Sequence, residues 1–138
     1  MPTPPSDGFS RRDPSDQGRL AACISAAVVH VFSEHTGRGP TRARTTIDGQ
    51  TVVVILQDSM TKAERSLVQA GKDAEVLQLR RSFQETMASD LVTVVERLTR
   101  TGVQAFMSAN HIEPDAAAEI FLLDRRVDGL GERPEYRT

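Results

Sequence analysis

The chain has 138 residues, which is enough for one domain with a substantial core. Its 17 basic and 19 acidic residues give a net charge of −2, so the composition offers no electrostatic basis for binding nucleic acid or an anionic membrane surface. The single cysteine, Cys23, excludes an internal disulfide and a cysteine-based zinc site, as expected in a reducing cytoplasm.

The first predicted helix follows residues 1–15, a segment rich in Pro, Ser and Asp that we expect to be a disordered tail. Ser15 or Asp16 can cap this helix, and the glycines and proline of residues 37–40 end it. The longest mostly apolar run of the chain, residues 20–32, lies within the helix. It is shorter than the roughly 20 residues that span a bilayer, so we expect no direct membrane insertion. Apolar residues mark one face of the helix: Leu20, Ile24, Val28 and Val31.

A β-hairpin and two helices are predicted next. The hairpin has strands over residues 41–47 and 51–57, and the Asp48-Gly49 pair between them favours a type I′ turn. Thr61 and Glu64 have the spacing of a capping box, which predicts a short helix ending by Gly71.

A longer helix is predicted to begin at Asp73, which we expect to cap it, and to end at Gly102. Its apolar residues recur every three or four positions, which indicates one buried stripe. The stripe consists of Val76, Leu79, Phe83, Met87, Leu91, Val94 and Leu98.

The last predicted element is a second hairpin. Residues 105–109 alternate between apolar and polar side chains, and an apolar run over residues 117–123 follows. Pro114 belongs in the turn between them, because proline has no N–H to donate to a sheet. We call the polar residues of this turn the hairpin tip. The hairpin tip, Asn110–Asp115, contributes four candidate binding residues: Asn110, His111, Glu113 and Asp115.

The element order, helix–hairpin–helix–helix–hairpin, predicts an α+β fold. We expect a four-stranded antiparallel sheet built from the two hairpins and packed with about three helices. Residues 16–125 form this single domain, and residues 126–138 are expected to be a disordered C-terminal tail. Residues 52–56 and 120–123 are apolar at every position, so both sheet faces should be buried. Either the helices divide between the two faces, or they cover one face and a second subunit covers part of the other.

Two groups of side chains are candidates for binding. At the hairpin tip, imidazole and carboxylate groups suit a divalent metal ion or acid/base chemistry. The alternative is structural, with Asn110 and Asp115 capping the backbone of the turn. The second group consists of arginines that can hold an anion or a partner's carboxylate, or that instead form an exposed charged strand which resists aggregation: Arg38, Arg42 and Arg44.

Five segments, in this order, resemble the MpsC-like family, long described as a domain of unknown function. The segments are residues 36–40, 48–54, 61–65, 105–115 and 118–123. The resemblance implies a cytoplasmic, non-membrane protein linked to a sodium-translocating, membrane-potential-generating system. It carries no catalytic residues over to this chain.

The sequence therefore predicts a non-enzymatic cytoplasmic accessory or regulatory protein that acts by binding another protein. We expect a homodimer without a cofactor. The resemblance adds an expected docking site on the cytoplasmic face of a membrane cation-translocating complex. Two alternatives stay open. One is a small-molecule or metal-ion binding domain that uses the hairpin tip or the three arginines, and the other is an enzyme that uses His111 as a base.

Overall fold

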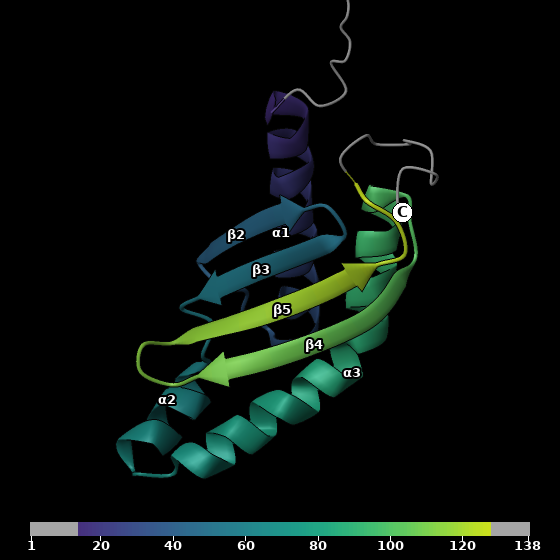
Figure 1. The fold of residues 1–138 in the computed structure, drawn as a ribbon. Helices are drawn as coiled ribbons and strands as arrows, with labels where there is room; N and C mark the ends of the chain where they lie inside the picture. Colours follow the sequence, from purple (N-terminus) through teal and green to yellow (C-terminus); the bar gives the residue numbers. More distant parts are fainter. Residues whose placement is uncertain (1–13, 128–138) are drawn as a thin grey trace, which may run out of the picture.

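Three helices and one four-stranded antiparallel sheet make up the computed structural model, which describes residues 14–127 (Figure 1). The strand order across the sheet is β2-β3-β5-β4, so β2 and β4 are the edge strands. The predicted α+β class, the antiparallel sheet and the order of elements are confirmed. The elements are α1 (Pro14–Thr36), β2 (Arg42–Asp48), β3 (Thr51–Gln57), α2 (Lys62–Gln69), α3 (Asp73–Thr99), β4 (Val103–His111) and β5 (Ala116–Leu123).

Glycine shapes the turn between β2 and β3, although not the predicted turn. Asp48 pairs with Thr51, so Gly49 and Gln50 form the two-residue loop. Gly49 has a φ of +62°, whereas neither Asp48 nor Gln50 has a positive φ. A glycine at the first loop position is the pattern of a type II′ turn, so the predicted type I′ turn was wrong.

The short helix α2 begins as predicted. The Glu64 N–H donates to the Thr61 hydroxyl at 3.2 Å, and the Thr61 N–H donates to the Glu64 carboxylate at 2.8 Å. The capping box is confirmed. It satisfies two backbone donors that the first turn of a helix otherwise leaves without a partner.

Both ends of α3 differ from the prediction. Lys72, not Asp73, occupies the N-cap position, and it makes no capping side-chain bond. At the other end Arg100, not Gly102, takes the left-handed conformation, with a φ of 61°. Gly102 lies close to Asp124 instead, and a side chain at position 102 would require the Asp124 carboxylate to shift.

All three helices lie on the same side of the sheet (Figure 1). Helix α1 packs against β2 and α3, and α3 packs against β4. No described helix covers the opposite face, so the first of the two alternatives, in which the helices divide between the two faces, is wrong. The fully buried apolar side chains of the core are Ile24, Val28, Val52, Val54, Leu56, Met87, Leu91, Val95, Phe121 and Leu123.

Several side chains differ in burial from the predicted pattern. On α3, Arg80 and Gln84 are buried, whereas Leu79 of the predicted stripe is 37% exposed. Cys23 is exposed although it lies among small apolar residues of α1. Met107 of β4 is apolar and is nevertheless 45% exposed. Periodicity therefore located the helices correctly but not every residue that they bury.

The predicted disordered tails, residues 1–15 and 126–138, lie mostly outside the described residues and stay predictions. Inside the described part, α1 already begins at Pro14. At the other end Val127 is 1% exposed and belongs to the core. The folded region therefore includes residues on both sides of the expected domain, 16–125.

Candidate functional site

The sheet face turned away from the helices is an apolar surface, which we call the open face. The antiparallel register brings the outward side chains of neighbouring strands into common rows. Ile55 is 40% exposed and Met107 is 45% exposed. The side chains at the centre of the open face are Val53 and Ile55 from β3, Ala118, Ile120 and Leu122 from β5, and Ala105, Met107 and Ala109 from β4.

The composition of the open face sets it apart from an ordinary solvent-facing sheet. The apolar centre comes from β3, β5 and β4, and three strands about 4.8 Å apart, with seven residues each at about 3.3 Å, span roughly 330 Å². The largest apolar patch of a monomeric protein is typically about 300–600 Å² and often has a function. An antiparallel sheet with one wet face normally carries polar residues on that face, which β3 and β5 do not. The open face is therefore suited to contact with another protein surface.

Two of the three candidate arginines stand at the β2 side of the open face. Arg42 and Arg44 are exposed and alternate with partly buried residues along the strand. Together with Ile55 and Gln57 they line a hollow of about 560 Å³. Positive charge beside apolar surface favours a contacting group that carries carboxylates.

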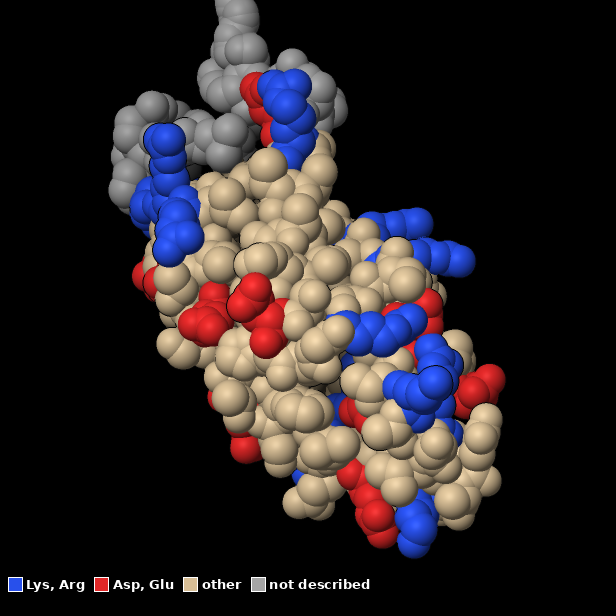
Figure 2. Space-filling view, turned by 180° about the vertical axis from the view of Figure 1, so that it is seen from behind, with Lys and Arg blue, Asp and Glu red and all other residues tan. Residues whose placement is uncertain are grey.

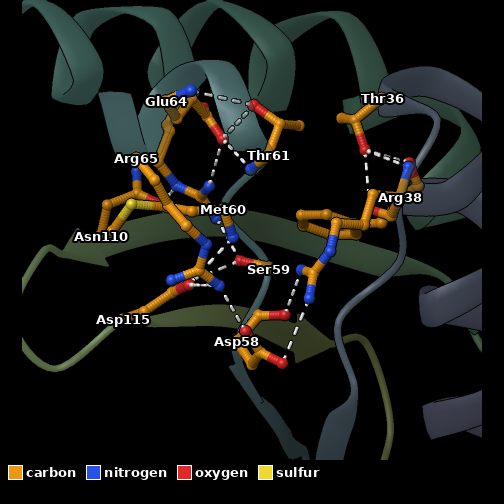
Figure 3. Close-up of polar contacts among 12 residues, drawn as sticks. Thr36, Arg38, Asp58, Ser59, Met60, Thr61, Glu64, Arg65, Asn110 and Asp115 are labelled. Atoms are coloured by element: carbon orange, nitrogen blue, oxygen red, sulfur yellow. Dashed lines mark hydrogen bonds and ion pairs between the residues drawn. The ribbon is translucent and has the colours of Figure 1, made fainter. Parts of the chain in front are cut away.

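The third arginine, Arg38, lies elsewhere and is engaged by Asp58. It donates to the Asp58 carbonyl oxygen at 2.5 Å and to Asp58 Oδ2 at 3.2 Å (Figure 3). Thr41 and Arg65 also donate to the Asp58 carboxylate, at 2.8 Å and 2.6 Å. The Thr41 hydroxyl, and after it the two guanidinium groups, hold the pKa of Asp58 below its usual value against an opposing effect of desolvation. Arg38 therefore braces the loop between β3 and α2 and does not join the other two arginines.

Asp115 of the hairpin tip also has a structural role in that loop. Its Oδ2 accepts a hydrogen bond from the Met60 N–H at 2.9 Å, and its Oδ1 lies 3.5 Å from the Ser59 hydroxyl (Figure 3). The Arg65 guanidinium is 3.8 Å away. We expected Asp115 to cap the backbone of its own turn. It instead accepts a hydrogen bond from backbone that is distant in sequence, so that expectation was wrong.

The other tip residues do not converge on one point. His111 is exposed, and its Nδ1 lies 2.9 Å from the carbonyl oxygen of Pro114. The Glu113 side chain is exposed and has no hydrogen bond or ion pair with a described residue, whereas Asn110 bonds to Gln84 of α3. Among residues 14–127, no group of three or more His, Cys, Asp and Glu side chains could hold a metal ion. The tip thus brings no ligand set together.

A buried polar network lies between α3 and the sheet. Arg80 donates to Glu64 Oε1 at 3.3 Å, to the Ser59 hydroxyl at 2.5 Å and to Asn110 Oδ1 at 3.2 Å. Arg80 is 6% exposed and Glu64 is 2% exposed. Glu64 Oε2 has no hydrogen-bond partner among the described residues. Because a buried charge needs a partner, Arg80 and Glu64 depend on each other.

The network continues through Gln84 to a second buried acid, Glu119 of β5. Gln84 donates to Glu119 Oε2 at 2.8 Å, and the Ser108 hydroxyl donates to the other carboxylate oxygen. Burial raises the pKa of Glu119 to about 7, although the bonds from Ser108 and Gln84 and the charge of Arg80 act against the rise. The carboxyl group is therefore partly protonated near neutral pH.

Sequence reasoning missed this network, although the chain contained two signals. Arg80 and Gln84 are four apart, so they share a face of α3. Glu119 stands between Ala117 and Phe121 at alternate positions of an apolar strand, so it points the same way as they do. A charged residue on the apolar side of a strand indicates a buried partner.

The helix side of the molecule carries mixed charge. Figure 2 shows Lys and Arg side chains interspersed with Asp and Glu side chains, with broad uncharged surface between them. This distribution agrees with the net charge of −2. It gives that side no continuous positive field of the kind that binds a polyanion.

The fold and the open face define the class of protein: a small α+β domain with helices on one side of its sheet and an apolar surface on the other. The chain belongs to the MpsC family, as the resemblance predicted. The matching family model, described as "Na+-translocating membrane potential-generating system (MpsC)", covers residues 16–125. No curated protein and no solved structure matches the chain. Within residues 14–127, no helix combines the length and the hydropathy needed to cross a membrane.

Proposed function

We propose that this protein is a non-enzymatic cytoplasmic accessory component of a sodium-translocating, membrane-potential-generating system, and that it acts by binding other protein chains. The open face is the observation that carries the proposal, because roughly 330 Å² at its centre is apolar and no described helix covers it. The family description supports the link to such a system. The diverging side chains of the hairpin tip favour binding over catalysis.

The occupant of the open face is a second copy of the chain. Two sheets pack face to face at about 10 Å, and outward side chains such as Ile55 and Ile120 would interdigitate between them. The apolar centres of two open faces bury roughly 650 Å². The surrounding rim, β2 included, has to supply the rest of the about 1,000 Å² that a specific interface needs. Arg42 and Arg44 stand at one side of the apolar centre, so their charges can stay in water.

A second candidate function rests on the hollow beside the arginines. Its volume of about 560 Å³ and the exposed guanidinium groups of Arg42 and Arg44 suit a small anionic molecule. Such a ligand would be displaced by salt and by charge reversal at either arginine, whereas an apolar dimer contact would persist at high salt.

Light scattering coupled to size exclusion tests the dimer. At micromolar concentration the wild-type chain should show about twice its 15.1 kDa mass, and Ile55→Glu should show the monomer mass. Leu79→Glu is the matched control, because Leu79 is 37% exposed on α3 and Ile55 is 40% exposed on the open face. A monomeric wild type, or equal effects of the two substitutions, would contradict the proposed dimer.

A second measurement tests the link to the membrane system. The purified chain should bind the detergent-solubilised sodium-translocating complex from the same cell in biolayer interferometry. It should not float with neutral liposomes that lack the complex. Flotation with bare liposomes, or no response to the complex, would count against an accessory role on its cytoplasmic face.

A further inference from the structure

The two edges of the sheet differ in charge. The β2 edge carries Arg42, Arg44 and Asp48, and charged residues of this kind prevent an edge strand from pairing with another chain. The β4 edge has no charged side chain from Val103 to Asn110. The backbone of β4 is therefore the unprotected edge of the sheet, open to pairing with an added strand.

A groove runs beside this unprotected edge. Helix α3 extends past β4 on the helix side of the sheet (Figure 1), and a groove of about 430 Å³ separates them. We call it the edge groove. Its lining residues are Leu77, Arg81, Gln84, Glu85 and Ala88 from α3, and Phe106, Ser108, Ala109 and Asn110 from β4. A strand added to β4 would lie above this stretch of α3 and would cover it as the other strands cover the helices.

The rim of the edge groove carries two unpaired charges of opposite sign. Arg81 and Glu85 are exposed, and neither side chain has a hydrogen bond or ion pair with another residue in the described part of the chain. They are one helical turn apart, at about 5–6 Å between Cβ atoms. Alternate side chains of an extended strand point the same way at about 6.6 Å. The two spacings match.

We propose that the edge groove binds an extended segment of a partner protein, which joins the sheet as a fifth strand beside β4. The segment carries an acidic and a basic side chain two residues apart on the side facing α3, where they pair with Arg81 and Glu85. Backbone bonds to β4 supply affinity, and this charge pair supplies selectivity. A second copy of the chain is a poorer occupant, because it would bring its own α3 to the side where α3 already extends past β4 (Figure 1).

The edge groove and the open face are different surfaces, so this inference stands or falls separately from the proposed dimer. The probes are two capped peptides of the same composition, TVEVKVT and TVKVEVT, which differ in the order of the two charges. The direction of the added strand fixes which order of charges places the acid beside Arg81 and the base beside Glu85. The full-length wild-type chain should therefore bind one peptide about tenfold more tightly than the other, because one forms two exposed ion pairs and the other places like charges together. Fluorescence anisotropy measures both affinities. The preference should reverse in the double variant Arg81→Glu/Glu85→Arg.

Arg97→Glu is the control, because it reverses an exposed charge in the last turn of the same helix and should leave the preference unchanged. Hydrogen exchange locates the peptide: amides of β4 should exchange more slowly in the complex, and amides of β2 should not. Three results would overturn the inference: no binding of either peptide at millimolar concentration, a preference that the double variant fails to reverse, or protection of β2 in place of β4.

Discussion

The two faces of the sheet are built by the same strands, but at the centre of the sheet the polar residues lie on the face that the helices cover. The face covered by helices contains a buried acid, Glu119, together with Ser108 and Asn110. The open face has no charged residue at its centre, where Ile55 and Met107 are among the exposed side chains. Across the centre of β3, β5 and β4 the more uniformly apolar face is therefore the uncovered one, whereas its β2 margin carries Arg42 and Arg44.

This difference teaches that apolar content alone does not tell which face of a sheet receives the helices. On the covered face, Gln84 and Arg80 of α3 satisfy the polar groups of the strands, so the polar residues fix how the helix sits. On the open face, apolar side chains without such partners leave the orientation of a contacting surface free. The covered face specifies one arrangement within the chain, and the open face offers area to another chain.

Removing Arg80, the buried arginine on the covered side of the sheet, should have the largest effect. Arg80→Ala leaves Glu64 buried without its charged partner, so the free energy of unfolding should fall by about 3–5 kcal/mol. Urea unfolding measures it. Arg81→Ala removes the exposed neighbour and should change stability by less than about 0.5 kcal/mol. Similar losses in both variants would show that the buried ion pair does not stabilise the covered face.

Neighbouring residues of β3 allow a direct comparison of the two faces. Leu56 points into the core and is 0% exposed, so Leu56→Ala should destabilise the monomer by about 3 kcal/mol. Ile55 points to the open face, and Ile55→Ala should change monomer stability by less than about 1 kcal/mol. Thermal unfolding at concentrations that keep the chain monomeric gives both values. A loss at Ile55 as large as at Leu56 would mean that the open face is covered within the chain.

The buried acid of the covered face should make stability depend on pH. Burial raises the pKa of Glu119 from its usual value of 4.5 to about 7 on folding, so between these two pH values the folded chain binds more protons than the unfolded chain. Stability should therefore fall as pH rises through this range, by up to about 3 kcal/mol. Glu119→Gln should flatten that part of the curve and raise the melting temperature at pH 8 relative to wild type. An unchanged slope in the variant would assign the pH dependence to another group.

Substitutions in the hairpin tip should have the smallest effects on stability. Asp115→Ala removes the hydrogen bond from the Met60 N–H and should lower the free energy of unfolding by about 1 kcal/mol, as the loss of a helix cap does. His111→Ala removes an exposed ring and should leave both the melting temperature and the dimer mass unchanged. Loss of binding in His111→Ala with intact stability would instead make the tip a functional site.

Local signals in the sequence predicted the elements of the fold, because each depends on residues close together in the chain. The capping box of Thr61 and Glu64 needs a spacing of three, and the two hairpins need a turn between apolar strands. The errors at Asp48-Gly49 and at Gly102 also have a local cause. A glycine can be required either because the backbone has a positive φ or because another group approaches it closely, and the residue type alone does not tell which.

Contacts between distant segments could not be predicted in the same way. Asp115 binds the loop at Met60, and Arg80 joins α2, α3 and β4 through partners that no spacing rule connects. The three candidate arginines also do not form one group, because Arg38 pairs with Asp58 and lies apart from Arg42 and Arg44. Composition and periodicity indicate which faces of the helices and strands are buried. The pairings between distant side chains depend instead on how the helices and strands pack against one another.

The position of β5 has a consequence for folding. It is the last described strand, yet it lies between β3 and β4, with Val54 paired to Glu119. The β2–β3 hairpin therefore keeps an unpaired edge throughout synthesis until β5 emerges from the ribosome. Joining the two hairpins closes a long stretch of chain that contains α2 and α3, a step expected to be slow compared with hairpin formation. Until then the nascent chain exposes an unpaired apolar strand, so the risk of aggregation lasts until β5 has emerged and paired with β3.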